Sequence, residues 1–250
     1  MLRYSRGTSP AGQMRTLAIL PIKSFGAAKQ RLSGLLGNGS RQALAQAMFL
    51  DVLASLRRVQ GIDAVAVITA DADAETAARR GGVDVLGDPE ESGQSTAVRI
   101  GIRHGLALGF ERVLLVPGDT PLIEAWEIAA MLKRAEEEEI EAVIVPDRHG
   151  SGTNALLLTP PQAMDPSFGT DSLERHRQAA LEAGLSHRIE AVASLMLDVD
   201  RPEDLAELSV TLDERRGQAC MTRGALRQLD RCSGVRGRLQ RPPVGPVAPA

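Results

Sequence analysis

The chain has 250 residues, a formal net charge of −3 and few aromatic side chains: one Trp, one Tyr and four Phe. This composition disfavours nucleic-acid modules, which stack bases on aromatic side chains and bind the phosphate backbone with excess positive charge. No apolar run approaches the ~18 residues of a membrane span, and the first residues lack the apolar core of a secretory signal. We therefore expect a cytoplasmic protein with no nucleic-acid or membrane partner.

Aliphatic runs with the length of buried strands alternate with helical patterns along the chain. Strands are expected at 16–21, 64–69, 112–117, 142–146 and 154–158. Helices are expected at 40–59, 95–108, 124–138 and 171–184. Strands separated by helices predict βαβ units, so we expect one α/β, Rossmann-like domain with a mostly parallel sheet and helices on both faces.

This domain is expected to span residues 15–213. Residues 1–14 are small and polar, and the segment 214–250 is rich in Arg, Gly and Pro, so both ends are expected to be disordered. Cys220 and Cys232 lie in the second of these segments without the spacing of a metal site, which favours a reducing compartment.

A basic turn follows the first expected strand. Lys23, Lys29 and Arg31 supply positive charge there, and Gly26 would let backbone N–H groups approach an anion. The turn matches neither a Walker motif nor a dinucleotide-binding fingerprint. Taken alone, it is explained equally well as a phosphate site and as a solvated basic turn.

Carboxylates follow other expected strands, at the edge of the sheet where ligands collect. Asp119 comes after Pro117 and Gly118, and Asp198 and Asp200 would face the same side of a strand. Two carboxylates on one face repel unless a cation lies between them, and Mg²⁺ prefers oxygen ligands. These residues are candidate Mg²⁺ ligands, although Asp119 alone is explained better as part of a Pro-containing turn.

Two further loops could hold an anion. The stretch "DRHGSGTNALLL" carries Thr153 among glycines, and "SFGTDSLERH" places Gly169 before a helix whose first turn contains Ser172. A helix N-terminus offers unpaired N–H groups and the positive end of a dipole. Taken alone, the segment from Gly169 to Ser172 is explained better as a simple helix cap, and His149 as a loop residue without a role in binding or catalysis. His176 is expected to pack rather than to catalyse.

Five segments together resemble one family: "LPIKSFGAAKQRL", "VPGDTPLI", "DRHGSGTNALLL", "FGTDSLERH" and "LDVDRPEDL". The family is that of the 2-phospho-L-lactate and phosphoenolpyruvate guanylyltransferases of coenzyme F-420 biosynthesis, which are MobA-like nucleotidyltransferases. The resemblance runs from Thr16 to Leu208. It implies the fold of nucleotide-diphospho-sugar transferases, transfer of GMP from GTP to phosphoenolpyruvate, a Mg²⁺ cofactor and release of pyrophosphate. It leaves a homodimer open.

The resemblance also implies roles for individual residues. Lys23, Lys29 and Asp119 would be catalytic. The nucleotide would be held by Lys23, Gly26, Lys29, Arg31, Gly93 and Ser95, and Mg²⁺ by Asp119, Asp198 and Asp200. Thr153, Gly169 and Ser172 match the positions that hold the phosphorylated acid.

Three points stay open at the level of sequence. The acceptor could equally be 2-phospho-L-lactate or 3-phospho-D-glycerate, since these acids differ by small groups. A non-catalytic nucleotide-binding protein is the alternative from another class, and the carboxylates after two strands speak against it. Related enzymes more often have Leu-Asn where Gln94 and Ser95 stand, which leaves the recognition of guanine open.

Overall fold

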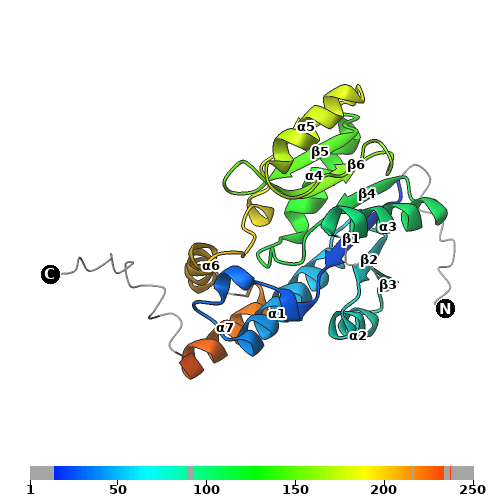
Figure 1. Ribbon diagram of the computed structural model, residues 1–250. Helices are drawn as coiled ribbons and strands as arrows, with labels where there is room; N and C mark the ends of the chain where they lie inside the picture. Colours follow the sequence, from blue (N-terminus) through cyan, green and yellow to red (C-terminus); the bar gives the residue numbers. More distant parts are fainter. Residues whose placement is uncertain (1–13, 89–92, 216, 234–236, 238–250) are drawn as a thin grey trace.

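Seven strands form one sheet in the order β3-β2-β1-β4-β6-β5-β7 (Figure 1). The computed structural model describes residues 14–88, 93–215, 217–233 and 237. The strands are β1 Thr16–Ile22, β2 Ala64–Thr69, β3 Asp84–Gly87, β4 Arg112–Leu115, β5 Ala142–Pro146, β6 Thr153–Leu158 and β7 His187–Ile189. All neighbours pair in parallel except β6, which runs antiparallel to both β4 and β5.

Helices cover both faces of this sheet, as expected. They are α1 Asn38–Leu56, α2 Ala72–Arg80, α3 Gln94–Ala107, α4 Ala125–Glu137, α5 Ser172–Glu182, α6 Pro202–Glu214 and α7 Cys220–Ser233. Alternate residues of β1 enter opposite core clusters: Ala18 and Leu20 pack with α1, α2 and α4, whereas Leu17 and Ile19 pack with α3 and α5. The predicted single α/β domain with a mostly parallel sheet is confirmed.

The sequence patterns missed the two edge strands. β3 and β7 are four and three residues long and are only partly buried. Short, half-exposed edge strands lack the continuous aliphatic run that marked the central strands. The central strands begin and end within two residues of their expected positions.

The prediction that Asp198 and Asp200 lie on a strand is wrong. Residues 197–200 form an irregular segment between the short 3₁₀-helix η3, Ala193–Leu195, and α6. The Val199 N–H donates to the Asp119 carbonyl oxygen at 3.1 Å, which ties this segment to the loop after β4. A single cross-link of this kind positions the segment without building a sheet ladder.

The prediction of a disordered segment at 214–250 is wrong for residues 220–233, which form α7. Leu226 and Leu229 of α7 join a third core cluster with Leu44 and Met48 of α1. Both carboxylate oxygens of Asp51 on α1 accept hydrogen bonds from the first turn of α7, at 3.1 and 2.7 Å. Two leucines at helical spacing are enough to dock a helix that is otherwise polar and rich in arginine.

Most of the other residues of the two predicted tails lie outside the described residues. These are residues 1–13, 216, 234–236 and 238–250. Along the part of the chain that is described, no helix is both long enough and apolar enough to cross a membrane.

Candidate active site

Two adjoining cavities lie beyond the carboxyl ends of β1 and β4. The smaller, of ≈ 300 Å³, is lined by the turn after β1, by α1 and by the start of α3. The larger, of ≈ 540 Å³, is lined by the loops before β6, before α5 and before α6. Five residues line both cavities: Lys23, Gln94, Pro117, Asp119 and Asp200. A ligand in one cavity would therefore meet a ligand in the other at Lys23 and the two carboxylates.

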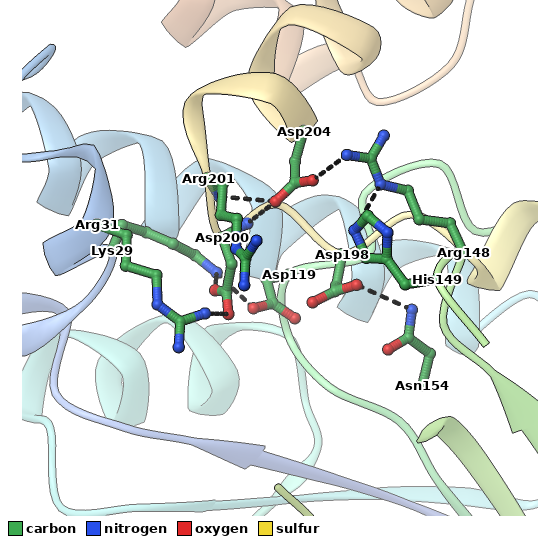
Figure 2. A network of polar contacts seen from close by, with 10 residues as sticks. All are labelled: Lys29, Arg31, Asp119, Arg148, His149, Asn154, Asp198, Asp200, Arg201 and Asp204. Carbon is green, nitrogen blue, oxygen red and sulfur yellow. Dashed lines mark hydrogen bonds and ion pairs between the residues drawn. The ribbon is translucent and has the colours of Figure 1, made fainter. Parts of the chain in front are cut away.

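Lys29 lies at the centre of this junction. Its ammonium donates to Asp119 Oδ2 and, at 3.0 Å, to Asp200 Oδ1, and only 6% of its side chain is exposed (Figure 2). Burial opposes the charge, but the two carboxylates outweigh it and raise the pKa of Lys29. Lys29 is therefore a fixed positive charge at neutral pH.

The Lys29 backbone is left-handed, with φ of 56°, a conformation that is uncommon outside glycine. This turn lies between two short 3₁₀-helices, η1 Phe25–Ala27 and η2 Gln30–Leu32. The second helix is anchored by Leu32, which is fully buried in the third core cluster. The basic turn is thus anchored to the core at Leu32 and holds Lys29 buried, while Lys23 and Arg31 are exposed.

Asp200 is held from several sides. Arg31 Nη1 lies 3.5 Å from Asp200 Oδ2. The Asp200 backbone N–H donates to Asp204 Oδ2 at 2.9 Å. Asp204 in turn pairs with Arg148 at 2.6 Å. Burial alone would raise the pKa of Asp200, but the charges of Lys29 and Arg31 hold it below its usual range. Asp200 is therefore an ionised and already neutralised carboxylate.

Asp198 has the opposite environment. Burial first, and then the charge of Asp119, raise its pKa to about 6. Its side-chain donor is the neutral amide of Asn154, 3.2 Å from Oδ1 (Figure 2). Asn154 also donates to the carbonyl oxygens of Leu195 and Met196, so it fixes the whole segment that carries Asp198. A buried carboxylate beside a second one is a place where a bound cation would be stabilised.

The chemistry of these donors fits a hard divalent cation. No cluster of three or more His, Cys, Asp or Glu side chains suited to a metal occurs in the described ranges. Mg²⁺ is, however, usually held by one or two carboxylates and completed by water and substrate phosphates. Asp119 and Asp198 can supply such a pair, and Asp119, like Asp200, also accepts a hydrogen bond from Lys29.

Gly118 explains how Asp119 reaches the junction. A Cβ atom at this position would lie 2.3 Å from Ile22 Cδ1 of β1, so glycine lets the loop after β4 pass close to β1 without displacing the Ile22 side chain. Lys23, next to Ile22, is exposed at the rim shared by both cavities. The basic turn, Asp119 and the segment from Asp198 to Asp200 thus lie side by side, joined by Lys29.

The predicted acceptor residues also come together. Thr153, Gly169 and Ser172 all line the larger cavity. The Thr153 N–H donates to Ser172 Oγ at 2.9 Å, which joins the start of β6 to the start of α5. Gly169 has φ of 114°, a conformation that a side chain would strain. The loop before α5 can therefore turn sharply at the cavity wall.

Three predicted nucleotide-binding residues do not line the smaller cavity: Gly26, Arg31 and Ser95. Arg31 lines the larger cavity. Gly93 lines the smaller cavity, but Phe25 and Ala27 line it in place of Gly26. Ser95 accepts a hydrogen bond from the Phe168 N–H at 3.0 Å. Ser95 on α3 thus holds the loop that contains Phe168, beside the larger cavity. No pattern in the sequence indicates this contact.

The reasoning from sequence also missed residues that support the site. The Asn154 amide donates to Asp198, a role that the motif around Asn154 does not indicate. Asp204 accepts from the Arg201 N–H at the start of α6 and pairs with Arg148. Asp88 lines the smaller cavity and is buried. The contacts of Asn154 with Asp198 and of Asp204 with Arg148 join residues far apart in the sequence.

Known proteins resemble this chain over most of its length. The family model described as "Guanylyl transferase CofC like" matches residues 16–230. A phosphoenolpyruvate guanylyltransferase of Conexibacter woesei is 50% identical over 216 residues, which are 86% of this chain and 97% of that protein. A 2-phospho-L-lactate guanylyltransferase of Methanothermobacter thermautotrophicus is 36% identical over 195 residues, which are 78% of this chain and 84% of that protein.

Solved structures agree on the fold. A protein from Desulfovibrio desulfuricans G20 assigned to the nucleotide-diphospho-sugar transferases superposes with a TM-score of 0.71 at 17% identity, over 91% of this chain and 99% of that chain. A cytidylyltransferase from Leptospira borgpetersenii gives a TM-score of 0.55 at 14% identity, over 89% and 97%. The expected fold and the resemblance read from the motifs are confirmed. The chain belongs to the family of CofC-like guanylyltransferases.

Proposed function

We propose that this chain transfers GMP from GTP to phosphoenolpyruvate, giving enolpyruvoyl-2-diphospho-5'-guanosine and pyrophosphate, as a cytoplasmic enzyme of coenzyme F-420 biosynthesis. The 50% identity to the Conexibacter woesei enzyme supports this acceptor. Relatives named for 2-phospho-L-lactate and 3-phospho-D-glycerate are 36% and 31% identical. The observation that carries the proposal is the junction of two cavities at Lys23, Asp119 and Asp200.

The smaller cavity is our choice for GTP and the larger one for the acid. The smaller cavity has apolar walls from α1, including Met48 and Phe49, which suit a purine base. Asp88 and Gln94 line it as well and could bond the polar edge of guanine. The larger cavity is lined mainly by polar residues of the loops around β6 and α5.

The reaction needs little chemistry from the protein. A phosphate oxygen of the acid attacks the α-phosphorus of GTP, and the bond from that phosphorus to the bridging oxygen of pyrophosphate breaks. The attacking oxygen is already anionic at neutral pH, so no general base is required. The obstacle is the repulsion between two polyanions, so catalysis should come from positioning and charge neutralisation.

Lys29 and Lys23 supply the positive charge that this transfer needs. Lys29 is held as an ammonium between Asp119 and Asp200, close to the place where both ligands would meet. Lys23 lies at the rim of both cavities, where it can bind the triphosphate and the departing pyrophosphate. The exposed Arg31 would add charge at the entrance.

Nucleotidyl transfer generally uses a divalent metal, and we propose Mg²⁺ here, held by Asp119 and Asp198. When bound, it would offset the charge of the phosphates around the reacting phosphorus. Asp198 would then keep its carboxylate ionised, although burial favours its protonated form. Asp200, the third carboxylate predicted to bind Mg²⁺, shares Lys29 with Asp119 and stays a candidate ligand.

The acceptor assignment is tested by pyrophosphate release from GTP and Mg²⁺ with a panel of acids. The panel contains phosphoenolpyruvate, 2-phospho-L-lactate and 3-phospho-D-glycerate, each over a range of concentrations. We expect the highest kcat/KM with phosphoenolpyruvate. A higher value with another acid would change the acceptor, and binding of GTP without release from any acid would favour the non-catalytic alternative.

A further inference from the structure

His176 lies one layer behind the wall of the larger cavity. It is on the first turns of α5, is fully buried, and packs edge-on against Phe168 with ring centroids 5.1 Å apart. Its two ring nitrogens reach different elements: Nε2 is 2.8 Å from the Ser167 backbone nitrogen and Nδ1 is 2.9 Å from Thr153 Oγ1. Nothing in the mechanism above uses this side chain.

These two contacts determine which nitrogen carries the proton. The Ser167 backbone N–H can only donate, so Nε2 of His176 must accept and cannot carry a hydrogen. A neutral imidazole then has its hydrogen on Nδ1, which donates to Thr153 Oγ1. Burial, and then the charge of Arg175, lower the pKa of His176 to about 4, which agrees with a neutral ring.

The direction of this hydrogen bond orients the Thr153 hydroxyl. Because Oγ1 accepts from His176, the hydroxyl hydrogen of Thr153 remains available to donate. Ser172 is in the same state, since its Oγ accepts from the Thr153 N–H at 2.9 Å. Both residues line the larger cavity, and within the described part of the chain these two are the hydrogen bonds of their hydroxyl groups.

We propose that His176 is a positioning residue for the acceptor: it fixes the Thr153 hydroxyl as a donor. Thr153 and Ser172 then form a wall that binds a group able only to accept hydrogen bonds, such as a carboxylate or phosphoryl oxygen. A ligand that presents a hydroxyl donor at this wall would be bound less well. The proposal rests on the proposed function, because the group it selects belongs to the acid acceptor.

A purely structural role for His176 is the competing explanation. Through Nε2, the ring holds the Ser167 N–H and therefore the loop before α5. The two roles use different nitrogens, so variants that keep one contact at a time separate them. In His176→Asn, the amide can donate from near the Nδ1 position. In His176→Gln, the amide reaches the Nε2 position and can accept from Ser167.

The kinetic test measures KM for phosphoenolpyruvate and for GTP in both variants, with folding checked by thermal melting. We expect His176→Gln to raise KM for the acid about 10- to 100-fold, the loss typical of a hydrogen bond to a charged group, with KM for GTP unchanged. His176→Asn should stay within roughly threefold of the wild type. The proposal would be overturned if KM for phosphoenolpyruvate rose equally in His176→Gln and His176→Asn. It would also be overturned if KM for GTP rose as much as KM for the acid.

A double-mutant cycle shows whether His176 acts through Thr153. Thr153→Val leaves the bond from Ser167 to His176 in place and should weaken acid binding as much as His176→Gln does. In the Thr153→Val background, His176→Gln should add nothing. If it adds its full effect there, the two residues act independently and the proposal fails.

The tautomer can be read without any variant. In ¹⁵N-labelled wild-type protein, long-range ¹H–¹⁵N spectra should show one buried histidine protonated at Nδ1 near pH 7. Protonation at Nε2 in an active enzyme would overturn this proposal alone. Failure of the wild type to release pyrophosphate with any acid would overturn the proposed function, and this proposal with it.

Discussion

Lys29 donates hydrogen bonds to both Asp119 and Asp200, although Asp200 lies 171 residues further along the chain. This contact joins the turn after β1, the loop after β4 and the segment before α6 (Figure 2). The ammonium occupies the position where a positive charge is needed between two carboxylates. The electrostatic arrangement of the site is therefore built before any ligand binds.

Replacing Lys29 should affect turnover and metal binding in opposite directions. We expect Lys29→Met to slow GMP transfer by roughly 10²–10³, the loss typical of a transition-state charge contact. Without the ammonium, Asp119 is no longer neutralised, so Mn²⁺ should bind the nucleotide-free protein more tightly than it binds the wild type. Steady-state kinetics and electron paramagnetic resonance of free Mn²⁺ measure the two effects.

The control for Lys29 is Lys133→Met. Lys133 is an exposed lysine on α4 that pairs with Glu137 four residues away, and surface pairs of this kind contribute little. Its replacement should leave both turnover and Mn²⁺ affinity as they are. An unchanged rate in Lys29→Met would remove Lys29 from the mechanism.

Asp119→Asn should abolish measurable transfer, with a loss of roughly 10³ or more, since a carboxylate at the junction contributes charge and not core packing. Thermal melting should show that the variant is folded. Asp165→Asn is the matched control, because Asp165 is highly exposed and pairs only at 3.5 Å with Arg99. Activity like that of the wild type in Asp119→Asn would exclude this residue from metal binding and catalysis.

His176 should make stability depend on pH in the acidic range. Its pKa is about 4 in the folded protein and ~6.5 in an unfolded chain. Between these values the unfolded state binds a proton that the folded state excludes, so stability falls as pH drops from ~6.5 to ~4. The full contribution, present above pH ~6.5, is on the order of 3 kcal/mol.

Asp198 acts in the opposite sense over nearly the same range. Its pKa is raised to about 6, so the folded state holds a proton that the unfolded state releases, and stability falls as pH rises from ~4 to ~6. The wild-type profile mixes both effects. The test is therefore urea unfolding of wild type and His176→Gln at pH 5 and pH 7, and the stability cost of the variant should be smaller at pH 5. An equal cost at both pH values would contradict the assignment.

Helix α7 should be needed for the stability of the domain. Leu226→Ala removes a buried side chain from the cluster that also contains Leu32 of the basic turn and Val199 between the two aspartates. We expect a loss of about 2–4 kcal/mol in urea unfolding. Met221→Ala on the same helix is the control, because Met221 is exposed, and it should cost far less. Equal and small losses would mean that α7 is not docked in solution.

Sequence patterns located the central elements because burial on both faces gives aliphatic runs that are visible without any partner. The position of Asp119 could be predicted for the same reason, because the end of an aliphatic run shows where a strand ends and its loop begins. The sequence predicts a strand at Asp198 and Asp200 because apolar and acidic residues alternate there, as they do in a half-buried strand. An irregular segment can have the same alternation. Its real conformation depends on Asn154 and on the Asp119 carbonyl.

Features that depend on distant partners could not be predicted. The alternation of Arg and Gly around Leu226 and Leu229 concealed a helix whose two leucines fill a gap beside α1. His176 looked like a packing residue because its effect is on the direction of one hydrogen bond. Such roles depend on geometry between elements, which composition and spacing do not encode.

The bond formed in the reaction tests the central claim most directly. In ³¹P NMR of wild-type protein with GTP, Mg²⁺ and phosphoenolpyruvate, we expect the signals of a new diphosphate linking the two substrates, together with an equal amount of pyrophosphate. Both should be absent when the acid is omitted. Formation of GDP and inorganic phosphate, or no change in the spectrum, would contradict a site in which two phosphates meet at Lys29 and Asp119.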